Sequence, residues 1–202
     1  MTNVSIPVDP VTPAPDALAR AADVLRRGGL VAFPTETFYG LGAAALDRSA
    51  VRRVFALKGR PASSPLLVLV DGLPMAERIA VIPATARPLI ARHWPGALTL
   101  VFAARDVVPE ELTASTGKVG VRFSSHPVAS GLVHALGDPV TAPSANLSGR
   151  APPTDAASVA QDFGGTIEVI LDAGETAGGL PSTVLDVTVD PPRVIRPGAV
   201  KV

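Results

Sequence analysis

Apolar residues recur at the spacing of one helical face in several separate stretches of this sequence. In the first stretch, Leu18, Ala21 and Leu25 follow Asp16, a residue type that can cap a helix, and Gly28 marks the end. Similar spacing predicts further helices. They cover residues 47–57, residues 74–94 in two pieces, residues 127–136 with proline in the first turn, and residues 154–163 with Thr154 as the cap.

Short, continuous apolar runs separate the predicted helices and are typical of buried strands. They cover residues 30–33, 66–70, 97–103, 119–123, 140–142, 167–171, 183–187 and 194–196. Helices and strands alternate without a long linker, which favours a single α/β domain over residues 16–202. Residues 1–15 contain Pro7, Pro10, Pro13 and Pro15, and we expect them to form an extended, proline-rich lead-in.

The chain of 202 residues carries 18 acidic and 18 basic side chains, so its formal net charge is zero. Proteins that coat nucleic acid usually have a clear basic excess, so we expect any RNA contact to be local. The sequence contains no cysteine, which excludes disulfides, thiolate metal sites and a cysteine nucleophile. The N-terminus does not read as a signal peptide, and no apolar run approaches the ~20 residues of a membrane span.

Several common catalytic patterns are also missing from the sequence. The 3 histidines lack a metal-ligand spacing such as HExxH, so we expect no metal held by the protein itself. No GxSxG elbow is present, which disfavours a serine hydrolase. Neither GxGxxG nor GxxxxGK[ST] occurs, so the patterns support neither a Rossmann site nor a P-loop.

Polar and glycine-rich segments follow two of the predicted strands, and binding sites of open α/β sheets gather at strand ends. The segments are Pro34–Gly42 (PTETFYGLG) and Thr141–Gly149 (TAPSANLSG). Their hydroxyl, amide and glycine groups can hold a small polar ligand or a nucleotide. The same residue types are common in tight turns and caps, so both interpretations stay open on these segments alone.

Cationic and hydroxyl residues also stand at the ends of predicted elements. Lys58 and Arg60 follow a predicted helix, where they can either clamp phosphate or complement the negative helix end. Arg122 ends a predicted strand and suits a bidentate grip on a carboxylate. Ser182 and Arg196 lie at two further strand ends. Taken singly, each of these residues is also compatible with an ordinary surface or strand-end position.

In combination, these segments closely resemble the YrdC-type family of threonylcarbamoyl-AMP synthases. The resemblance rests on FPTETFYGLG, the Lys58-x-Arg60 pair followed by PLLV, VGVR, APSANLSG and STVLDV, in family order over about residues 16–200. It implies an α/β fold of the type shared with DHBP synthase: a twisted mixed sheet flanked by helices, with an electropositive concave cavity. It also implies the short, single-domain form, without the extra C-terminal domain of larger members.

The resemblance further implies roles for individual residues. Lys58 and Arg60 would be catalytic. The contacts to ATP would come from Lys58, Arg60, Ser144, Asn146 and Arg196, and those to L-threonine from Thr35, Arg122 and Ser182, with Arg122 on the carboxylate. Mg²⁺ would accompany the triphosphate of ATP.

The reaction implied by the resemblance joins L-threonine, bicarbonate or CO₂, and ATP into threonylcarbamoyl-AMP and pyrophosphate. Positioning and charge stabilisation would supply most of the catalysis, so the lack of an obvious base or nucleophile is compatible with it. A downstream transferase would then move the threonylcarbamoyl group onto a tRNA adenosine, with at most weak tRNA contact by this chain. A cytoplasmic location is expected.

Three positions differ from the common pattern of the resembled family. Leu69 stands where a substrate-side histidine is usual, Lys118 replaces a frequent threonine before VGVR, and Ser124 replaces a frequent proline after it. One alternative function is a nucleotide- or RNA-binding paralogue with no or different adenylating activity. Another is a carbamoyl-transfer domain of the hydrogenase-maturation type. The neutral charge disfavours RNA binding as the main role, and the lack of zinc-finger or acylphosphatase-like segments disfavours the last alternative.

Overall fold

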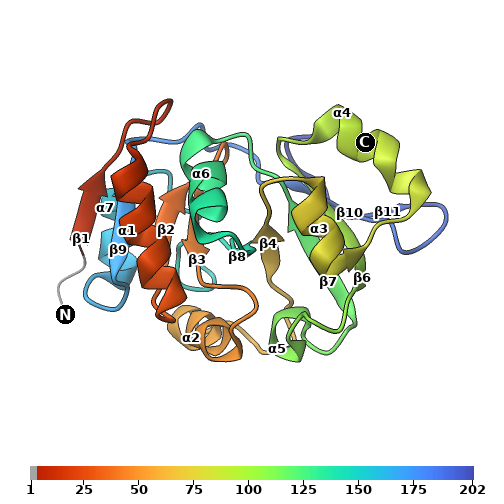
Figure 1. Cartoon of the computed structure of the whole chain (residues 1–202), viewed down its shortest axis with the longest axis horizontal. Helices are drawn as coiled ribbons and strands as arrows, with labels where there is room; N and C mark the ends of the chain where they lie inside the picture. Colours follow the sequence, from red (N-terminus) through yellow and green to blue (C-terminus); the bar gives the residue numbers. More distant parts are fainter. Residues whose placement is uncertain (1–3) are drawn as a thin grey trace.

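The computed structural model describes residues 4–202 (Figure 1). Its helices are α1 (Pro15–Arg26), α2 (Arg48–Lys58), α3 (Leu73–Ile79), the 3₁₀ turn η1 (Ala84–Ala86), α4 (Arg87–His93), α5 (Glu110–Thr113), α6 (Pro127–Leu136) and α7 (Ala156–Phe163). Its strands are β1 (Val4–Pro7), β2 (Val31–Pro34), β3 (Tyr39–Gly42), β4 (Leu67–Leu69), β5 (Ala80–Val81), β6 (Leu98–Ala104), β7 (Lys118–Arg122), β8 (Val140–Thr141), β9 (Val169–Asp172), β10 (Thr183–Asp186) and β11 (Arg193–Arg196). Across residues 4–202, every helix is too short or too polar to cross a bilayer.

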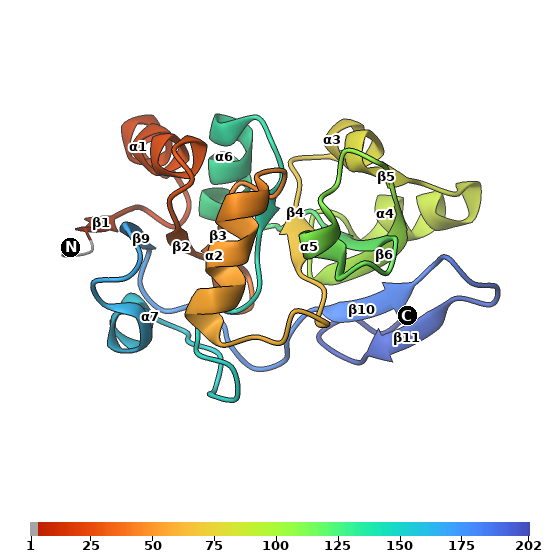
Figure 2. The same ribbon diagram turned by 90° about the horizontal axis from the view of Figure 1, so that it is seen from below.

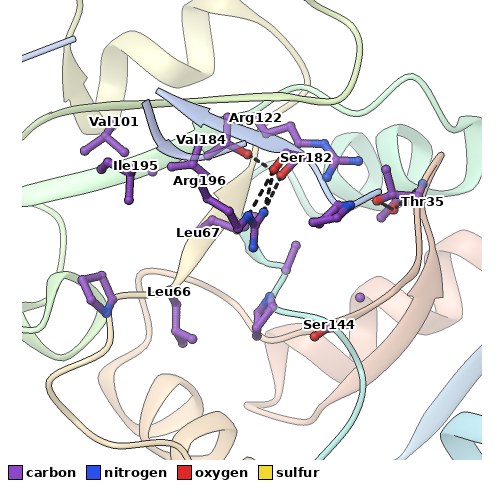
Figure 3. A pocket seen from close by; sticks show the side chains of 18 of the residues that line it. Thr35, Leu66, Leu67, Val101, Arg122, Ser144, Ser182, Val184, Ile195 and Arg196 are labelled. Atoms are coloured by element: carbon purple, nitrogen blue, oxygen red, sulfur yellow. Dashed lines mark hydrogen bonds between the residues drawn. The ribbon is translucent and has the colours of Figure 1, made fainter. Parts of the chain in front are cut away.

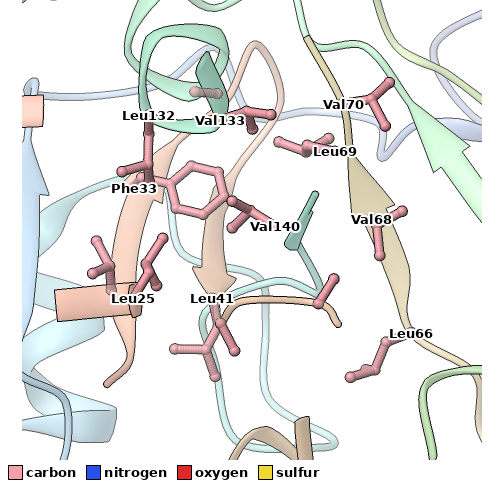
Figure 4. Packing of buried hydrophobic residues seen from close by; sticks show 14 of the residues in the cluster. Leu25, Phe33, Leu41, Leu66, Val68, Leu69, Val70, Leu132, Val133 and Val140 are labelled. Atoms are coloured by element: carbon pink, nitrogen blue, oxygen red, sulfur yellow. The ribbon is translucent and has the colours of Figure 1, made fainter. Parts of the chain in front are cut away.

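The first of two sheets has the strand order β1-β9-β2-β3. β9 pairs in parallel with both β1 and β2, whereas β3 runs antiparallel to β2. α1 and α6 pack against each other over one face, and α7 contacts β9 from the opposite face (Figure 2). Leu25 of α1, Phe33 of β2 and Leu132 of α6 are fully buried between the helices and the sheet (Figure 4).

The second sheet has the order β11-β10-β6-β7-β4-β8, and β5 pairs with the end of β6. It is mixed, because β10 is parallel to β6 while β7 is antiparallel to β6 and parallel to β4. α3 and α4 lie on one side of this sheet (Figure 2). The α/β class with mixed strands and flanking helices is therefore confirmed, but the strands divide into two sheets.

The two sheets meet along β3 and β8. Isolated bridges join Gly40 to Ser144 and Ala44 to Val140. The Thr141 hydroxyl donates to the carbonyl of Leu41 (3.0 Å), which adds a side-chain contact across the junction. This junction brings the segment after β2 beside the segment after β8. The two polar segments of the sequence, more than 90 residues apart, therefore share one side of the molecule.

Side-chain alternation along the central strands of the second sheet separates a core face from an open face. Leu100, Phe102, Val119 and Val121 point to the core face and are at most 1% exposed. Their neighbours in sequence point the other way and line a cavity. These neighbours are Thr99 and Val101 of β6, Gly120 and Arg122 of β7, and Val184 and Asp186 of β10.

The segment Pro34–Gly42 contains the strand β3, which the sequence patterns did not predict. Its glycines allow close packing, because a Cβ at Gly42 would lie 2.8 Å from the ring of Phe33 and 2.9 Å from Val140. Tyr39 is fully buried, and its hydroxyl donates to the carbonyl of Gly174 (2.7 Å). Residue-type statistics do not reveal such a strand, because pairing with β2 and close packing, rather than β-propensity, hold it in place.

Two of the predicted helix caps are wrong by one or two residues. α1 begins with Pro15 after Ala14, so Asp16 lies inside the first turn instead of capping it. α7 is capped by Asp155, whose carboxylate accepts from Ser158 N (2.7 Å), instead of by Thr154. At α7 the cause is local, since Thr154 and Asp155 are adjacent and both are suitable caps. At α1 the helix begins without a side-chain cap and has Pro15 in its first turn.

Part of the expected lead-in belongs to the first sheet. Val4–Pro7 pairs in register with Val169–Asp172 of β9, and Ile6 and Val8 are 9% exposed. Residues 1–3 lie outside the described part of the chain. Proline does not prevent this pairing, because an edge strand needs backbone donors on one side only.

Candidate functional site

A cavity of about 660 Å³ lies over the open face of the second sheet, beside its junction with the first. Strands β6, β7, β10 and β11 form its floor, and the segments that follow β2, α2 and β8 form its sides. Figure 3 shows Thr35 on one side, Val101 and Ile195 on the opposite side, and Arg122 and Arg196 between them. Its volume lies within the range of small-molecule sites.

The cavity lining has an excess of positive charge. Within residues 4–202 its cations are Arg60, Lys118, Arg122, Arg193 and Arg196, and its carboxylate is Asp186. Desolvation, and then the neighbouring guanidiniums of Arg122 and Arg60, lower the pKa of Arg196. Cations that repel one another in this way favour the binding of an anion between them, so the lining suits a ligand that carries several negative charges.

Arg122 is the buried cation of the site, with an exposed fraction of 4%. Its Nη2 atom lies 2.7 Å from Oε2 of Glu36, but the geometry gives this pair a charge contact without a hydrogen bond. The same Glu36 oxygen accepts from the hydroxyl of Ser124. Among the described residues, Nε and Nη2 of Arg122 have no hydrogen-bond acceptor. A buried guanidinium with open donors beside a cavity suits a ligand carboxylate.

Thr35 lines the cavity at the end of the segment that follows β2. Its hydroxyl donates to the carbonyl of Phe38 (2.7 Å) and accepts from the backbone N–H groups of Thr37 (3.2 Å) and Phe38 (3.3 Å). The side chain therefore fixes the shape of this turn. Thr35 also stands next to Glu36, the residue that contacts Arg122.

Ser182 and Arg196 form one unit at the start of β10 and the end of β11. Nη2 of Arg196 donates to the carbonyl (2.8 Å) and the hydroxyl (3.1 Å) of Ser182. The Ser182 hydroxyl also shares a hydrogen bond with Thr99 of β6 (3.0 Å). Both residues line the cavity.

Arg60 closes another side of the cavity. Its Nε donates to the carbonyl of Ser64 (3.1 Å) and its Nη2 to that of Pro65 (3.0 Å). These bonds fold residues 60–65 into a compact turn. Burial lowers the pKa of Arg60, but a guanidinium keeps its charge at any physiological pH.

Lys58 and Asn146 lie behind the cavity wall, outside its lining. The Lys58 ammonium donates to the carbonyls of Ser144 (2.5 Å) and Asn146 (2.6 Å), and the side chain is 3% exposed. Burial, and then the charge of Arg60, lower the pKa of Lys58 to about 8. Asn146 donates to the carbonyls of Leu147 (2.9 Å) and Arg150 (2.8 Å). Lys58 and Asn146 thus shape the loop from which Ser144 lines the cavity.

The sequence patterns assigned no role in the site to several of its residues. Glu36 and Ser124 surround Arg122, and Lys118 forms an ion pair with Asp186 (3.1 Å) inside the cavity lining. A usable signal existed for Lys118, because it lies four residues before Arg122 in one strand and alternation puts both on the same face. The contact between Glu36 and Ser124 joins residues far apart in sequence, so no local pattern reveals it.

Leu69 lies at the end of β4, opposite Arg122 in the register. It is 1% exposed and packs near Val133 and Val140 (Figure 4). It is not part of the cavity lining. The position at which the resembled family commonly has a histidine is therefore occupied here by an apolar core side chain.

Comparison with known proteins relates this chain to one protein family. The family model for Sua5, YciO and YrdC proteins, described as telomere recombination, matches residues 23–198. The chain is similar to a threonylcarbamoyl-AMP synthase of Pyrococcus abyssi (50% identity over 179 residues, 88% of this chain and 53% of the relative). It is also similar to one of Bacillus subtilis (43% over 185 residues, 91% and 54%). The chain thus spans about half the length of these curated relatives.

Among solved structures, the crystal structure of P. abyssi Sua5 complexed with L-threonine superimposes with a TM-score of 0.94 at 46% identity. The superposition covers 97% of this chain and 58% of the P. abyssi chain. The family match spans most of the chain, and it includes the segments that form the cavity. On these grounds, the chain belongs to the Sua5/YciO/YrdC family.

Proposed function

We propose that this chain is an L-threonylcarbamoyladenylate synthase, which forms threonylcarbamoyl-AMP from L-threonine, bicarbonate and ATP. The observation that carries the proposal is the cavity itself. It combines a buried arginine with open donors, Arg122, and further guanidiniums from Arg60 and Arg196. An amino-acid carboxylate and a triphosphate together supply the negative charge that such a lining favours. The names of the relatives and the threonine in the P. abyssi structure support the same substrates.

The proposed binding mode places threonine at the Arg122 end. Arg122 receives the carboxylate, while Thr35 and Ser182 line the same cavity. Glu36 and Ser124 position Arg122 through the charge contact and the hydrogen bond described above. In this arrangement the amine of threonine is directed into the cavity, toward the phosphate-binding residues.

The triphosphate of ATP is proposed to bind between Arg60, Arg196 and Ser144. Lys58 and Asn146 act from behind, because they fix the loop that presents Ser144. We propose Lys58 and Arg60 as the catalytic cations. In this proposal the charge of Lys58 acts on the phosphates through the cavity wall. Charge stabilisation of this kind requires no covalent contribution from the protein.

The proposed reaction has two bond-forming steps. First, the neutral amine of threonine attacks the carbon of bicarbonate or CO₂, and a C–N bond forms with loss of water or a proton. Second, an oxygen of the resulting N-carboxylate attacks the α-phosphorus of ATP. The bond to the β,γ-diphosphate breaks, and pyrophosphate leaves. Arg60 and Arg196 stabilise the charge on the transferring and leaving groups, and Arg122 holds the amino acid in line.

Mg²⁺ is expected to arrive with the triphosphate. Within residues 4–202 there is no cluster of three or more histidine or carboxylate side chains that could hold a metal. Asp186 in the cavity lining is already bound by Lys118 and Thr188. We therefore propose that the phosphate oxygens supply the ligands of Mg²⁺.

We propose that the chain acts in the cytoplasm. There it supplies threonylcarbamoyl-AMP to an enzyme that transfers the threonylcarbamoyl group to tRNA. The chain would hand over threonylcarbamoyl-AMP and make at most weak contact with tRNA. The balance of 18 acidic and 18 basic residues supports this division of labour, since tRNA-binding surfaces need a basic excess.

Pyrophosphate release from ATP with Mg²⁺ and bicarbonate tests the function, with L-threonine present, absent or replaced by L-serine. We expect threonine-dependent release. In the variant Arg122→Lys, the KM for threonine should rise about tenfold or more, because a lysine cannot form two parallel hydrogen bonds to a carboxylate. The dissociation constant of ATP should change little.

Arg87→Lys is the matched control, because Arg87 forms an exposed ion pair with Glu77 outside the cavity lining. It should behave as the wild type. ATP binding without pyrophosphate release in the wild type would instead indicate a nucleotide-binding paralogue. Loss of ATP binding with unchanged threonine binding in Arg122→Lys would move Arg122 to the nucleotide.

A further inference from the structure

The hydroxyl of Thr99 lies on the cavity side of the second sheet and has no role in the reaction proposed above. Thr99 stands on β6 between Leu98 and Leu100, which are fully buried in the core, and alternation turns its side chain the other way. It is nevertheless 1% exposed, so a ligand in the cavity can reach little of it. A buried hydroxyl is costly unless it is hydrogen-bonded, so the group that it meets is informative.

Two contacts fix the orientation of this side chain. Its hydroxyl oxygen lies 3.0 Å from that of Ser182, and the two share a hydrogen bond. Its methyl group lies over Gly120 of β7, where an added Cβ would come within 3.4 Å of Thr99 Cγ2. A β-branched side chain has few rotamers, so these contacts direct the oxygen to β10 and the methyl group to β7. A valine has the same shape, and the threonine therefore adds the hydrogen bond to Ser182.

The backbone on either side of this serine is held by other bonds. Thr183 N donates to the carbonyl of Ala97 (3.0 Å), and Ala199 N donates to that of Pro181 (2.9 Å). These backbone bonds do not depend on the side chain of Thr99. The Thr99 hydroxyl therefore determines the position of the serine hydroxyl without determining the path of the chain.

The Ser182 hydroxyl is one of two groups that hold Arg196. Nη2 of Arg196 donates to the carbonyl (2.8 Å) and the hydroxyl (3.1 Å) of Ser182, and Nε donates to the same carbonyl (3.3 Å), as the dashed lines of Figure 3 show. The Nη1 atom meets no acceptor within residues 4–202. Because a guanidinium is planar, bonds at Nε and Nη2 also set the direction of the free Nη1 donors.

Arg196 requires such bonds, because its neighbours repel it. The guanidiniums of Arg122 and Arg60 act on its charge, and Arg196 itself is an exposed residue on β11, the edge strand of the sheet. A long side chain in this position gains both entropy and electrostatic energy by turning outward. The bond to the Ser182 hydroxyl opposes this movement most effectively when the serine oxygen is itself fixed.

We infer that Thr99 is a positioning residue of the phosphate-binding site. Its hydroxyl fixes the Ser182 oxygen, Ser182 fixes the Arg196 guanidinium, and Nη1 of Arg196 meets the phosphates. Thr99 thus acts through Ser182 and makes no contact with the ligand. This assignment rests on the proposed function in so far as ATP brings the phosphates. It concerns anion binding, and so it is separable from turnover.

The test is calorimetric titration of the full chain with inorganic tripolyphosphate and with ATP. The proteins are the wild type, Thr99→Val, which keeps the shape and removes the hydroxyl, Thr99→Ser, which keeps the hydroxyl, Ser182→Ala, and the double variant Thr99→Val/Ser182→Ala. Thr113→Val is the matched control, because Thr113 is a buried threonine (4% exposed) outside the cavity lining whose hydroxyl donates to the carbonyl of Glu110 (3.2 Å). Urea unfolding measures the stability of each protein.

We expect Thr99→Val to bind tripolyphosphate and ATP about fivefold more weakly, the effect of one lost hydrogen bond. Thr99→Ser should bind both as the wild type does, because it retains the hydroxyl. Ser182→Ala should also lose affinity, and adding Thr99→Val to it should cause no further loss, since the two side chains act as one unit. Thr113→Val should bind both ligands as the wild type does, although it also loses a buried hydrogen bond.

Wild-type affinity for tripolyphosphate in Thr99→Val overturns the inference, because the hydroxyl would then serve the fold alone. A further loss in the double variant relative to Ser182→Ala overturns it as well, because Thr99 would then contact the ligand itself. Weaker binding by Thr99→Val with rescue by Thr99→Ser, in a chain whose wild type shows no threonine-dependent pyrophosphate release, sustains the inference and refutes the proposed function. Turnover by the wild type with unchanged binding in Thr99→Val refutes the inference alone. A wild type that binds neither tripolyphosphate nor ATP refutes both.

Discussion

The cations around the cavity differ in whether their N–H donors remain free to bind a ligand. Nε of the Arg122 guanidinium has no acceptor among the described residues, whereas the Lys58 ammonium is held by two backbone carbonyls. Arg122 is therefore ready to bind a ligand directly. Lys58 instead fixes the loop of Ser144 and adds positive potential from inside the wall.

The burial of Lys58 predicts a specific pH dependence of stability. Its pKa is lowered from 10.5 to about 8, mainly by burial, so between these values the unfolded chain binds more protons than the folded one. The free energy of unfolding should therefore rise with pH in this window for the wild type, relative to Lys58→Met. Urea unfolding of both proteins at about pH 7 and about pH 9.5 measures this difference.

The sign follows from the chemistry of the buried group. A charged lysine is desolvated in the folded state at low pH, and deprotonation removes that cost while two N–H donors remain for the two carbonyls. Effects of other titrating groups are common to both proteins and cancel in the comparison. A difference between the proteins that stays constant with pH would show that Lys58 keeps an ordinary pKa.

The strands of the second sheet contribute the floor of the site through strict alternation. On β6, β7 and β10, every second residue faces the cavity while the residues between them fill the core. The sides come from segments at strand and helix ends. Arg60, Lys58 and Arg196 hold these segments in place by donating hydrogen bonds to their backbone carbonyls. The floor is thus set by sheet register, and the sides by individual side-chain contacts.

The close approach of Gly198 to β10 gives a prediction for the Ser182–Arg196 unit. A Cβ at Gly198 would lie 2.2 Å from the carbonyl oxygen of Pro181 and 2.6 Å from the carbonyl carbon of Ser182. Gly198→Ala must therefore push two backbone segments apart. We expect a loss of about 1–3 kcal/mol in the free energy of unfolding, together with weaker ATP binding.

Urea unfolding and calorimetry measure the two effects. Ala199→Ser is the control, since Ala199 is exposed and adjacent in sequence. It should match the wild type in both measurements. A Gly198→Ala protein with full stability and full ATP affinity would mean that β11 and the segment after it can shift without disturbing Arg196.

The cavity as a whole draws on both sheets. Thr35 follows β2 of the first sheet, Arg122 ends β7 of the second, and Ser144 follows β8 at the junction. A ligand that contacts these residues connects the two halves of the molecule. Ligand binding should therefore stabilise the whole fold and not just a local segment.

Ligand-induced stabilisation follows from this arrangement. At about 100 times its dissociation constant, a ligand that binds the folded chain alone adds ~2.7 kcal/mol to the free energy of unfolding. We expect threonine and ATP each to raise the midpoint of thermal unfolding, and serine to do so less. In Arg122→Lys the threonine effect at the same concentration should fall by about half or more, as expected for a site at least about tenfold weaker, while the ATP effect remains. Equal stabilisation by unrelated amino acids would contradict a specific threonine site.

Local sequence patterns predicted most elements of the fold. The helix over residues 127–136 is found as α6 with the same bounds, and the strand over residues 119–123 is found as β7, shifted by one residue. Asp47 caps α2, at the start of the helix predicted over residues 47–57. These features depend on residues within one or two turns of each other, so spacing and capping chemistry are sufficient to identify them.

The chemistry available to the site also follows from residue identity. The family resemblance assigned Arg122 to L-threonine and Arg60 and Arg196 to ATP, and all three line one cavity. The absence of cysteine excludes thiol chemistry in any fold. What sequence spacing did not reveal is the strand Tyr39–Gly42, which exists because β2 pairs with it and Phe33 packs against its glycines.

The three-dimensional arrangement determined which polar residues reach the ligand side of the wall. Lys58 and Ser144 are 86 positions apart, and their hydrogen bond holds the Lys58 ammonium against the loop of Ser144, outside the cavity lining. The Lys118–Asp186 pair spans 68 positions and lies within the cavity lining. Residue types and local periodicity thus set the elements and the available charges, because both are short-range properties of the chain. Contacts between distant segments determined which side chains are buried, which face the cavity and which form ion pairs. The sequence alone does not show these contacts, because they exist only after the two sheets have come together.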